Sequence, residues 1–417
     1  MAAGWHGGIA TTRARPLLPT APRTPVAAAA AAEGTRGKGV AMSSSAAKVA
    51  VVGCGISGAS CASMLAGRGL SVTVFESGRG PGGRMSQRRF PPFPSSLPLF
   101  VPFFTCCSRL CGIFLGKSWN ARLRDKFGRL LIVVELAEGE ELLFDHGAPF
   151  FSTSNEEVMN IVKSWEEMGL VSEWKENFGC FDMKSSNFVD FEKDGSSKKY
   201  VGVPGMNSIC KALCREPGVE TKFETSVGKL NWRDGRNLWL LSGMGSENLG
   251  HFDSVVVSDK NVFSPRSSGL TGRPPPLEIS LIPELAGRLQ DIPVQSSFAL
   301  MLAFSEPLSL VSVLVCVRYA NDKLLSDIPV KGFAFKNSNV LNWAFCDSSK
   351  PGRLLSSSIS ERWVLHSTAE YAASVISKTG LKKPSTSTLV EVAGELLQEF
   401  ERTGLVTSRP FFMKAHR

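Results

Sequence analysis

The stretch from Lys48 to Glu76, KVAVVGCGISGASCASMLAGRGLSVTVFE, constrains the fold more than any other part of this 417-residue chain. It begins with an apolar, β-branched run at 49–52, which is typical of a strand buried on both faces. A helix-compatible segment, 59–68, and a second β-rich run, 71–75, follow. The order strand, glycine turn, helix and strand predicts an α/β fold with a Rossmann-like sheet.

Three glycines, Gly53, Gly55 and Gly58, join the first strand to the helix with G-x-G-x-x-G spacing. The first allows a tight turn, the second lets a pyrophosphate approach the backbone, and the third lets the helix pack closely on the strand. Ile56 and Ser57 lie at the helix N-terminus, where free N–H groups and a partial positive charge attract phosphates. The pattern predicts dinucleotide binding, and a plain βαβ core is the alternative.

Glu76 ends the second strand, where a carboxylate can accept hydrogen bonds from both ribose hydroxyls of an adenosine and would repel a 2′-phosphate. The loop RGPGGRM follows directly, with a second glycine pair, Gly82 and Gly83, and then Arg84. A nicotinamide-only Rossmann unit has no need of this second pair. The alternative is a Gly/Pro loop with a solvated arginine.

Together these motifs resemble the glutathione-reductase-like family of FAD enzymes, in the branch of amine oxidases, phytoene desaturases and renalase. The resemblance implies FAD as the cofactor, with the loop along its flavin side and Arg84 at the family's arginine. LLFDHGAPFF, 142–151, is similar to the D-x-G-A turn that meets the flavin in this branch. It adds four candidate cofactor-binding residues, Gly147, Ala148, Pro149 and Phe150. Asp145 and His146 suggest acid and base roles, but an Asp before a turn more often bonds backbone, and a lone His is more often satisfied locally.

A helix is expected from Ser154 to Met168, and YVGVPGMNSICKAL, 200–213, resembles a helix start of the same family. Strands are expected at 219–223, 227–232, 237–242 and 252–258. The resemblance implies that the backbone of Val227 touches the adenine; plain core packing is the alternative. Small residues do not follow the last of these strands, which leaves its contact with the dinucleotide in question.

The composition changes at Pro274, after which the sequence predicts a helix at 282–290 and the strands of an antiparallel substrate-domain sheet. The segment 360–376 is similar to a renalase-like strand and helix. Trp363 and His366 either face substrate or lie in the sheet core, which is the favoured interpretation. An amphipathic helix is expected at 389–400.

The first 47 residues are rich in Ala and Arg and contain a single acidic residue, Glu33. This composition is typical of a transit peptide, and the absence of a long apolar run argues against a secretory signal. We expect these residues to direct the protein to the chloroplast, with the mitochondrion as the alternative. A second alternative is that they form a disordered tail with no targeting role.

The net charge of +9 does not indicate nucleic-acid binding, because the first 47 residues contribute +4 and residues 90–139 contribute +3. The remaining +2 is ordinary for a soluble enzyme. Residues 90–139 begin FPPFPSSLPLFVPFF, which lacks charge, and their many prolines argue against a stable membrane span. We interpret this segment as an insertion, from a retained intron or gene-model error; a real amphipathic or membrane-touching loop is the alternative.

Ten cysteines form no C-x-x-C pair, so no metal site is predicted. Cys210 and Cys214 are one helical turn apart but lack the second pair that a zinc site needs. Tyr319 and Lys323 match a Y-x-x-x-K spacing by chance, because the glycine pattern of short-chain dehydrogenases is missing.

The expected organisation is a leader, 1–47, an FAD-binding domain, 48–270, and a substrate domain, 271–417, to which part of 150–200 contributes. Relatives continue beyond the residue that matches Arg417, so the substrate domain is expected to be truncated. The predicted function is a renalase-like, FAD-dependent oxidoreductase that takes a hydride from a small donor, a dihydronicotinamide isomer or an amine, onto flavin N5. The alternative is a non-catalytic or unstable variant with partial dinucleotide binding. The sequence leaves the catalytic residues, electron acceptor and oligomeric state open.

Overall fold

The computed structural model describes residues 46–91, 141–191, 197–277, 295–308, 330–353, 361–406 and 408–417, together with short strands within 98–133 and the single residues 284, 288 and 359. Residues 47–417 form one compact unit. The leader, most of residues 90–139, and Tyr319 and Lys323 lie outside the described residues, as does the helix expected at 282–290 except for Glu284 and Arg288, which are helical.

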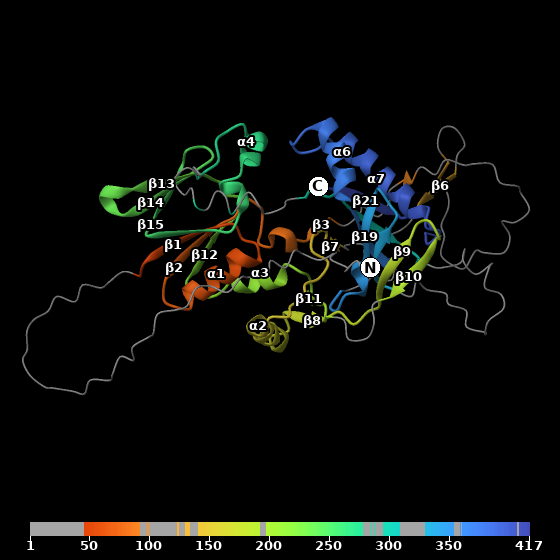
Figure 1. Cartoon of the computed structure of the whole chain (residues 1–417), viewed down its shortest axis with the longest axis horizontal. Helices are drawn as coiled ribbons and strands as arrows, with labels where there is room; N and C mark the ends of the chain where they lie inside the picture. The colour runs from red at the N-terminus through yellow and green to blue at the C-terminus, as the bar shows by residue number, and fades with distance from the viewer. Residues whose placement is uncertain are drawn as a thin grey trace, which may run out of the picture. The chain divides into compact units, whose positions relative to one another are not determined.

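The predicted βαβ unit is confirmed as β1 (Lys48–Val52), α1 (Ile56–Ala66) and β2 (Ser71–Phe75) (Figure 1). These strands belong to a four-stranded parallel sheet in the order β12-β2-β1-β16, with β12 at Val219–Lys222 and β16 at Ser254–Val257. β1 is central, and its Ala50 and Val51 are fully buried. This position explains why its sequence is continuously apolar.

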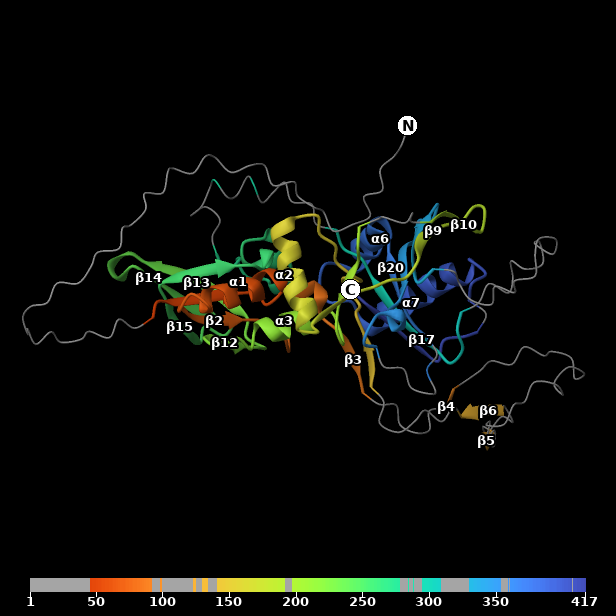
Figure 2. The ribbon, with the colours of Figure 1, turned by 90° about the horizontal axis from the view of Figure 1, so that it is seen from below.

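Helices α1 and α3 (Ser208–Leu213) lie side by side against the parallel sheet (Figures 1 and 2). α2 spans Glu156–Glu167, and the side chain of Asn155 caps it by accepting the N–H of Val158 at 2.9 Å. The helix therefore begins two residues after the expected start at Ser154, and the capping residue is the next one along the chain, Asn155. Asn at an N-cap satisfies a backbone donor that the helix leaves free.

Two of the strands expected after α3, at 227–232 and 237–242, are confirmed as β13 (Val227–Arg233) and β14 (Leu238–Gly243), which form a meander with β15 (Asn248–Phe252). β15 was not predicted, and the run expected at 252–258 contains the return strand β16. The chain then returns through β16 to pair in parallel with β1. A further strand pair joins β8 (Val171–Glu173) to β11 (Tyr200–Gly202). α4 spans Pro265–Thr271, and short 3-10 turns span Gly83–Met85, Asp234–Arg236, Lys260–Val262 and Asp347–Ser349.

The largest sheet among the described residues has seven strands, in the order β10-β9-β18-β19-β20-β17-β21. Its strands are β9 (Phe178–Asp182), β10 (Asn187–Phe191), β17 (Ala299–Phe304), β18 (Gly332–Lys336), β19 (Leu341–Cys346), β20 (Glu361–Ser367) and β21 (Phe412–His416). All neighbours are antiparallel except β9 and β18. The expected antiparallel sheet therefore contains one parallel pair, because β9 comes from a distant part of the chain.

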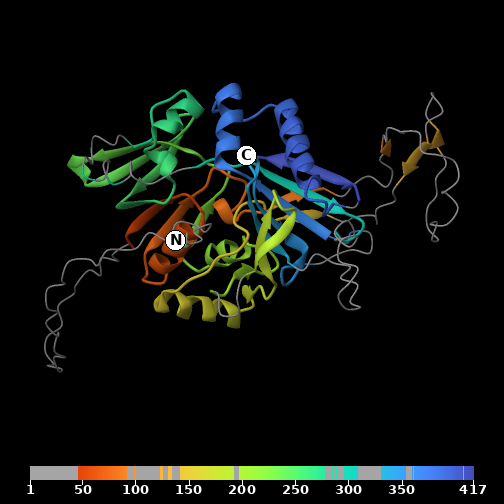
Figure 3. The same cartoon turned by 45° about the vertical axis from the view of Figure 1, so that its right-hand side comes forward.

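α7 (Thr386–Glu401) packs along β17, β19 and β21 of the seven-stranded sheet, and α6 (Ala369–Thr379) contributes Ala372 to the same hydrophobic cluster (both helices are blue in Figure 3). The Tyr371 hydroxyl donates to Glu395 at 2.6 Å and joins the two helices. α7 begins after Ser385, three residues before the expected start, because the Ser385 side chain accepts the N–H of Thr388 and caps it. No helix among the described residues is both long and apolar enough to cross a membrane.

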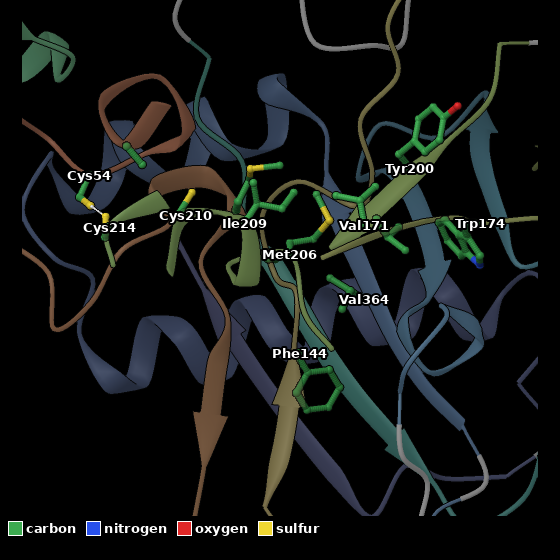
Figure 4. Close-up of a cluster of buried hydrophobic side chains, with 14 of the residues drawn as sticks. Cys54, Phe144, Val171, Trp174, Tyr200, Met206, Ile209, Cys210, Cys214 and Val364 are labelled. Carbon is green, nitrogen blue, oxygen red and sulfur yellow. Dashed lines mark hydrogen bonds between the residues drawn. The ribbon is translucent and has the colours of Figure 1, made fainter. Parts of the chain in front are cut away.

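One hydrophobic cluster runs from α1 and α3 of the parallel-sheet layer to β17 and β20 of the second sheet (Figure 4). It includes Cys54, Met206 and Ile209 on one side and Phe144 and Val364 on the other. Because these side chains are at most slightly exposed, the four-stranded and seven-stranded sheets share a continuous apolar core.

A short hairpin of β3 (Arg88–Phe90) and β7 (Leu142–Phe144) flanks the segment interpreted as an insertion. Phe90, the first residue of that segment, pairs with Leu142, and its ring packs on Phe412 at 4.7 Å. Phe90 therefore belongs to the fold. Between the hairpin strands, β4 (Pro98–Leu99), β5 (Leu123–Arg124) and β6 (Leu130–Val133) pair only with one another among the described residues.

Replacing residues 91–141 by Asn-Gly is expected to keep the fold and to raise its free energy of unfolding by about 1–3 kcal/mol, because a shorter loop costs less closure entropy. Chemical denaturation and soluble yield measure the effect. A control carries a Gly/Ser segment of the original length, which separates loop length from loop sequence. A lower yield of the deletion variant than of the parent would show that the segment belongs to the folded protein.

Candidate functional site

The turn between β1 and α1 leaves space only at its second glycine. Gly53 has φ of +99°, which favours glycine, and a Cβ on Gly58 would collide with the carbonyl oxygen of Gly53. A Cβ on Gly55 would meet nothing closer than the Cα of Gly83, at 4.0 Å. Packing therefore requires glycine at the first and third positions, whereas the second faces free space.

This free space adjoins the N-terminus of α1. The N-cap is Gly55, which has no side chain to accept the first N–H groups of the helix. Ser57 is exposed in the first turn, and Ile56 packs partly against the core. The arrangement can bind a phosphate group by N–H donation and by the helix dipole.

Glu76 lies beside this turn with its carboxylate held by two backbone donors. Its Oε2 accepts the N–H of Cys54 at 2.8 Å, and its Oε1 accepts the N–H of Gly78 at 2.7 Å. A carboxylate has about four acceptor positions. The Ser77 hydroxyl also donates to Oε1, at 3.4 Å. The backbone thus keeps the side chain in place, and at least one acceptor position remains for a ribose hydroxyl.

A cavity of about 210 Å³ opens beside Glu76, at the carboxyl ends of β1 and β2. Val227, which begins β13, lies in its wall, as do Ser226, Asp259 and Asn261. Pockets for whole drug-sized ligands measure about 300–1,000 Å³. This smaller cavity suits one end of a dinucleotide, next to the predicted ribose and adenine contacts.

The second glycine pair interlocks with the first. The N–H of Gly82 donates to the carbonyl of Cys54 at 2.8 Å, and Gly82 forms an isolated bridge with Gly55. Gly82 and Gly83 have φ of +141° and +53°, conformations that side chains disfavour. Arg84 is exposed at the end of this loop. The loop thus continues the surface that begins at the α1 N-terminus.

The D-x-G-A turn packs directly on the same loop. The N–H of Ala148 donates to the carbonyl of Arg84 at 2.7 Å, and a Cβ on Gly147 would collide with that carbonyl. Gly147 is therefore required by contact with protein backbone, in addition to any approach of a ring. Pro149 is half-buried, and the side chain of Phe150 packs among Trp174, Phe178 and Trp343.

Asp145 does more than bond backbone. It is 1% exposed and accepts the N–H of Met206 at 3.1 Å, as expected for an Asp before a turn. It also pairs with Lys350, at 3.1 Å, and with Arg353. Lys350 in turn lies 2.9 Å from Asp347, so these four residues form a buried ion cluster that joins the D-x-G-A turn to the second sheet.

Three histidines and Arg88 gather on the other side of the D-x-G-A turn. His366 bonds the carbonyl of His146 at 2.9 Å, and the rings of His146 and His416 lie 4.9 Å apart. Burial, together with His416, Arg88 and His366, lowers the pKa of His146 to about 3. Burial and Arg88 lower the pKa of His416 to about 4. All three rings are therefore neutral near pH 7, since burial also lowers the pKa of His366.

Trp363 is fully buried and donates to Glu361 at 2.8 Å, as the core interpretation predicts.

Sequence reasoning missed Ser258, whose hydroxyl bonds the carbonyls of Val52 and Gly53 at 3.1 and 2.9 Å. It also missed Asp347, Lys350 and Arg353. Their three-residue spacing in DSSKPGR is the available signal, but their partner, Asp145, lies about 200 positions away. No group of three or more potential metal ligands occurs among the described residues.

Residues 51–104 match a family model described as an NAD(P)-binding Rossmann-like domain. The matched segment contains the glycine turn, Glu76 and the second glycine pair. The chain thus has a mixed α/β fold with a parallel sheet and a Rossmann-like domain.

Among solved structures, a putrescine oxidase with redesigned cofactor binding is similar, with 11% identity, coverage of 88% of this chain and 84% of that chain, and a TM-score of 0.49. FqzB has 13% identity, coverage of 89% and 63%, and a TM-score of 0.40. The tetracycline destructase Tet(51) has 11% identity, coverage of 77% and 56%, and a TM-score of 0.36. The chain therefore spans less than two thirds of the last two proteins.

Proposed function

We propose that this chain is an FAD-dependent oxidoreductase of the glutathione-reductase-like class that accepts a hydride from a small donor. The observation that carries the proposal is the pair of interlocked glycine turns, in which Gly82 and Gly83 pack on Cys54 and Gly55 beside the open N-terminus of α1. A Rossmann unit that binds only a nicotinamide dinucleotide needs the first glycine turn and has no need of the second glycine pair. The match of residues 51–104 to a Rossmann-like family supports the dinucleotide half of the proposal.

The residues fit FAD in three places. The α1 N-terminus next to Gly55 would hold the pyrophosphate, and Glu76 with the cavity wall at Val227 would hold the adenosine. Arg84 and the D-x-G-A turn would border the flavin end. FAD supplies the hydride-accepting ring, so the protein needs no side-chain nucleophile and contributes binding, orientation and exclusion of water.

The motifs leave two donor classes open, a dihydronicotinamide isomer and a simple amine. The purified full chain should be yellow and should release FAD on denaturing extraction. Anaerobic mixing with each donor class and recording of flavin bleaching identifies the donor. Release of NAD without flavin would refute the cofactor proposal, whereas bound FAD that neither donor reduces would refute only the donor class.

Replacing Glu76 by alanine is expected to weaken FAD binding about 10- to 100-fold, which corresponds to about 1–3 kcal/mol, because charge-assisted bonds to the ribose are lost. Titration of the apoprotein with FAD, followed by flavin fluorescence, measures the change. The matched control is Glu220→Ala on the neighbouring strand β12, whose carboxylate bonds Thr73 and pairs with Lys222. Equal FAD affinity in the two variants, with both folded by circular dichroism, would remove Glu76 from the site.

A further inference from the structure

Two thiols from distant parts of the chain meet behind the glycine turn (Figure 4). The Sγ atoms of Cys54 and Cys214 lie 3.1 Å apart, although the residues are 160 positions apart in sequence. Cys54 is the middle residue of G-C-G, and Cys214 is the C-cap of α3. A disulfide bond measures about 2.05 Å, so the two sulfur atoms need to approach by only about 1 Å.

The two thiols differ in environment. Cys54 is fully buried, whereas Cys214 is 8% exposed. The hydrogen bond between the two thiols lowers the pKa of Cys214, and the same bond together with burial raises the pKa of Cys54. Cys214 is therefore the more exposed of the two residues and has the thiol that ionises first, as an attacking thiolate must.

We propose that Cys54 and Cys214 form a reversible disulfide in the folded protein, with a peroxide as the oxidant. The Cys214 thiolate attacks one oxygen of hydrogen peroxide, the O–O bond breaks, and a sulfenic acid and hydroxide form. Cys54 then loses its proton and attacks the Cys214 sulfur, which expels the second oxygen as water. The two sulfurs are oxidised by two electrons, and one peroxide is reduced to two water molecules. A small oxidant suits a pair with so little exposed surface.

The disulfide would link the C-terminal end of α3 covalently to the glycine turn between β1 and α1. The main chain of Cys54 holds both glycine motifs, because its N–H donates to Glu76 and its carbonyl accepts from Gly82, each at 2.8 Å. α3 continues through a short loop to β12, the strand next to β2. A disulfide here closes a long loop in the unfolded chain, so the oxidised protein should be the more stable form.

The experiment treats the folded full chain with hydrogen peroxide and analyses it by intact mass and by peptide mapping without reduction. The expected results are the loss of two hydrogen atoms, a peptide that links Cys54 to Cys214, and a rise of about 5 °C in the midpoint of thermal unfolding. Dithiothreitol should reverse all three. The mapping separates this bond from any formed by the four cysteines outside the described residues.

Cys214→Ser removes the attacking sulfur and is expected to abolish the linked peptide and the shift in midpoint. The matched control is Cys210→Ser, one helical turn earlier on the same helix and also buried, which should leave both unchanged. A stable sulfenic or sulfinic acid on Cys214, a Cys210–Cys214 bond, or a linkage that forms only in denaturant would each overturn the proposal.

Discussion

Replacing Asp145 by alanine is expected to lower the free energy of unfolding by about 3–5 kcal/mol, the loss that is typical when one partner of a buried ion pair is removed. Lys350 is fully buried and Arg353 is nearly so. Without Asp145, these two cations and the buried Arg362 face Asp347 as the remaining carboxylate of the cluster. Chemical denaturation of the variant and of the parent chain measures the loss.

Two further variants separate charge from position. Asp145→Asn keeps an oxygen for the N–H of Met206 but removes the charge, so it should retain most of the destabilisation. The matched control is Asp234→Ala on the exposed Asp234–Arg236 turn, which should change stability by no more than about 0.5 kcal/mol. A loss below about 1 kcal/mol in Asp145→Ala would show that water or another group compensates the two cations.

The environment of Asp347 supports this expectation. Burial would raise the pKa of its carboxyl, but Lys350, Arg353 and Arg362 together hold that pKa below its ordinary value. Asp347 is therefore held in its ionised form by these three cations. Without Asp145, the three buried cations face one carboxylate, so the excess of buried positive charge increases, which is the costly state.

The βαβ unit could be predicted from the sequence because its determinants are local. The run Val49–Val52, the glycine turn and the run Ser71–Phe75 each specify backbone conformation without help from distant residues, and the structure places strands at both runs. The strands β13 and β14 of the meander could be predicted for the same reason, whereas β15 was missed because its sequence, NLGHF, contains no apolar, β-branched run. Helix starts were less well placed, since Asn155 and Ser385 compete with nearby Ser and Thr residues as caps.

The tertiary parts of the site could not be predicted, because their signals are non-local. Asp145 was expected to bond backbone, and it does, but its cationic partners come from a loop after β19. The thiol pair of Cys54 and Cys214 likewise depends on how α3 packs beside α1. The parallel pairing of β9 with β18 also needs the whole chain. In each case, the residues are ordinary in their local sequence and acquire a role only when the sheets assemble.

The histidine cluster should make the protein sensitive to acid from about pH 6.5 downward, before most carboxylates begin to titrate. His146 has an ordinary pKa of 6.5 when unfolded and about 3 when folded. The unfolded state therefore binds a proton that the folded state rejects as the pH falls below about 6.5. The stability due to neutral His146 is complete above that value and is lost progressively down to about pH 3. His416, being half-buried, adds a smaller loss because solvent screens its charge.

Between about pH 7.5 and pH 4.5, His146 alone should account for a loss of about 2–3 kcal/mol in the free energy of unfolding. His146→Gln removes the titrating ring, and its unfolding free energy should fall less steeply over the same range, by that amount. His251→Gln, at an exposed position on β15, is the matched control and should follow the parent curve. The groups that face His146 are His416 on β21, Arg88 on β3 and His366 on β20. All three lower the pKa of His146 and so oppose its protonation. Parallel curves for the parent and His146→Gln would mean that His146 is protonated in the folded protein, and the cluster would then need an anion that neutralises it.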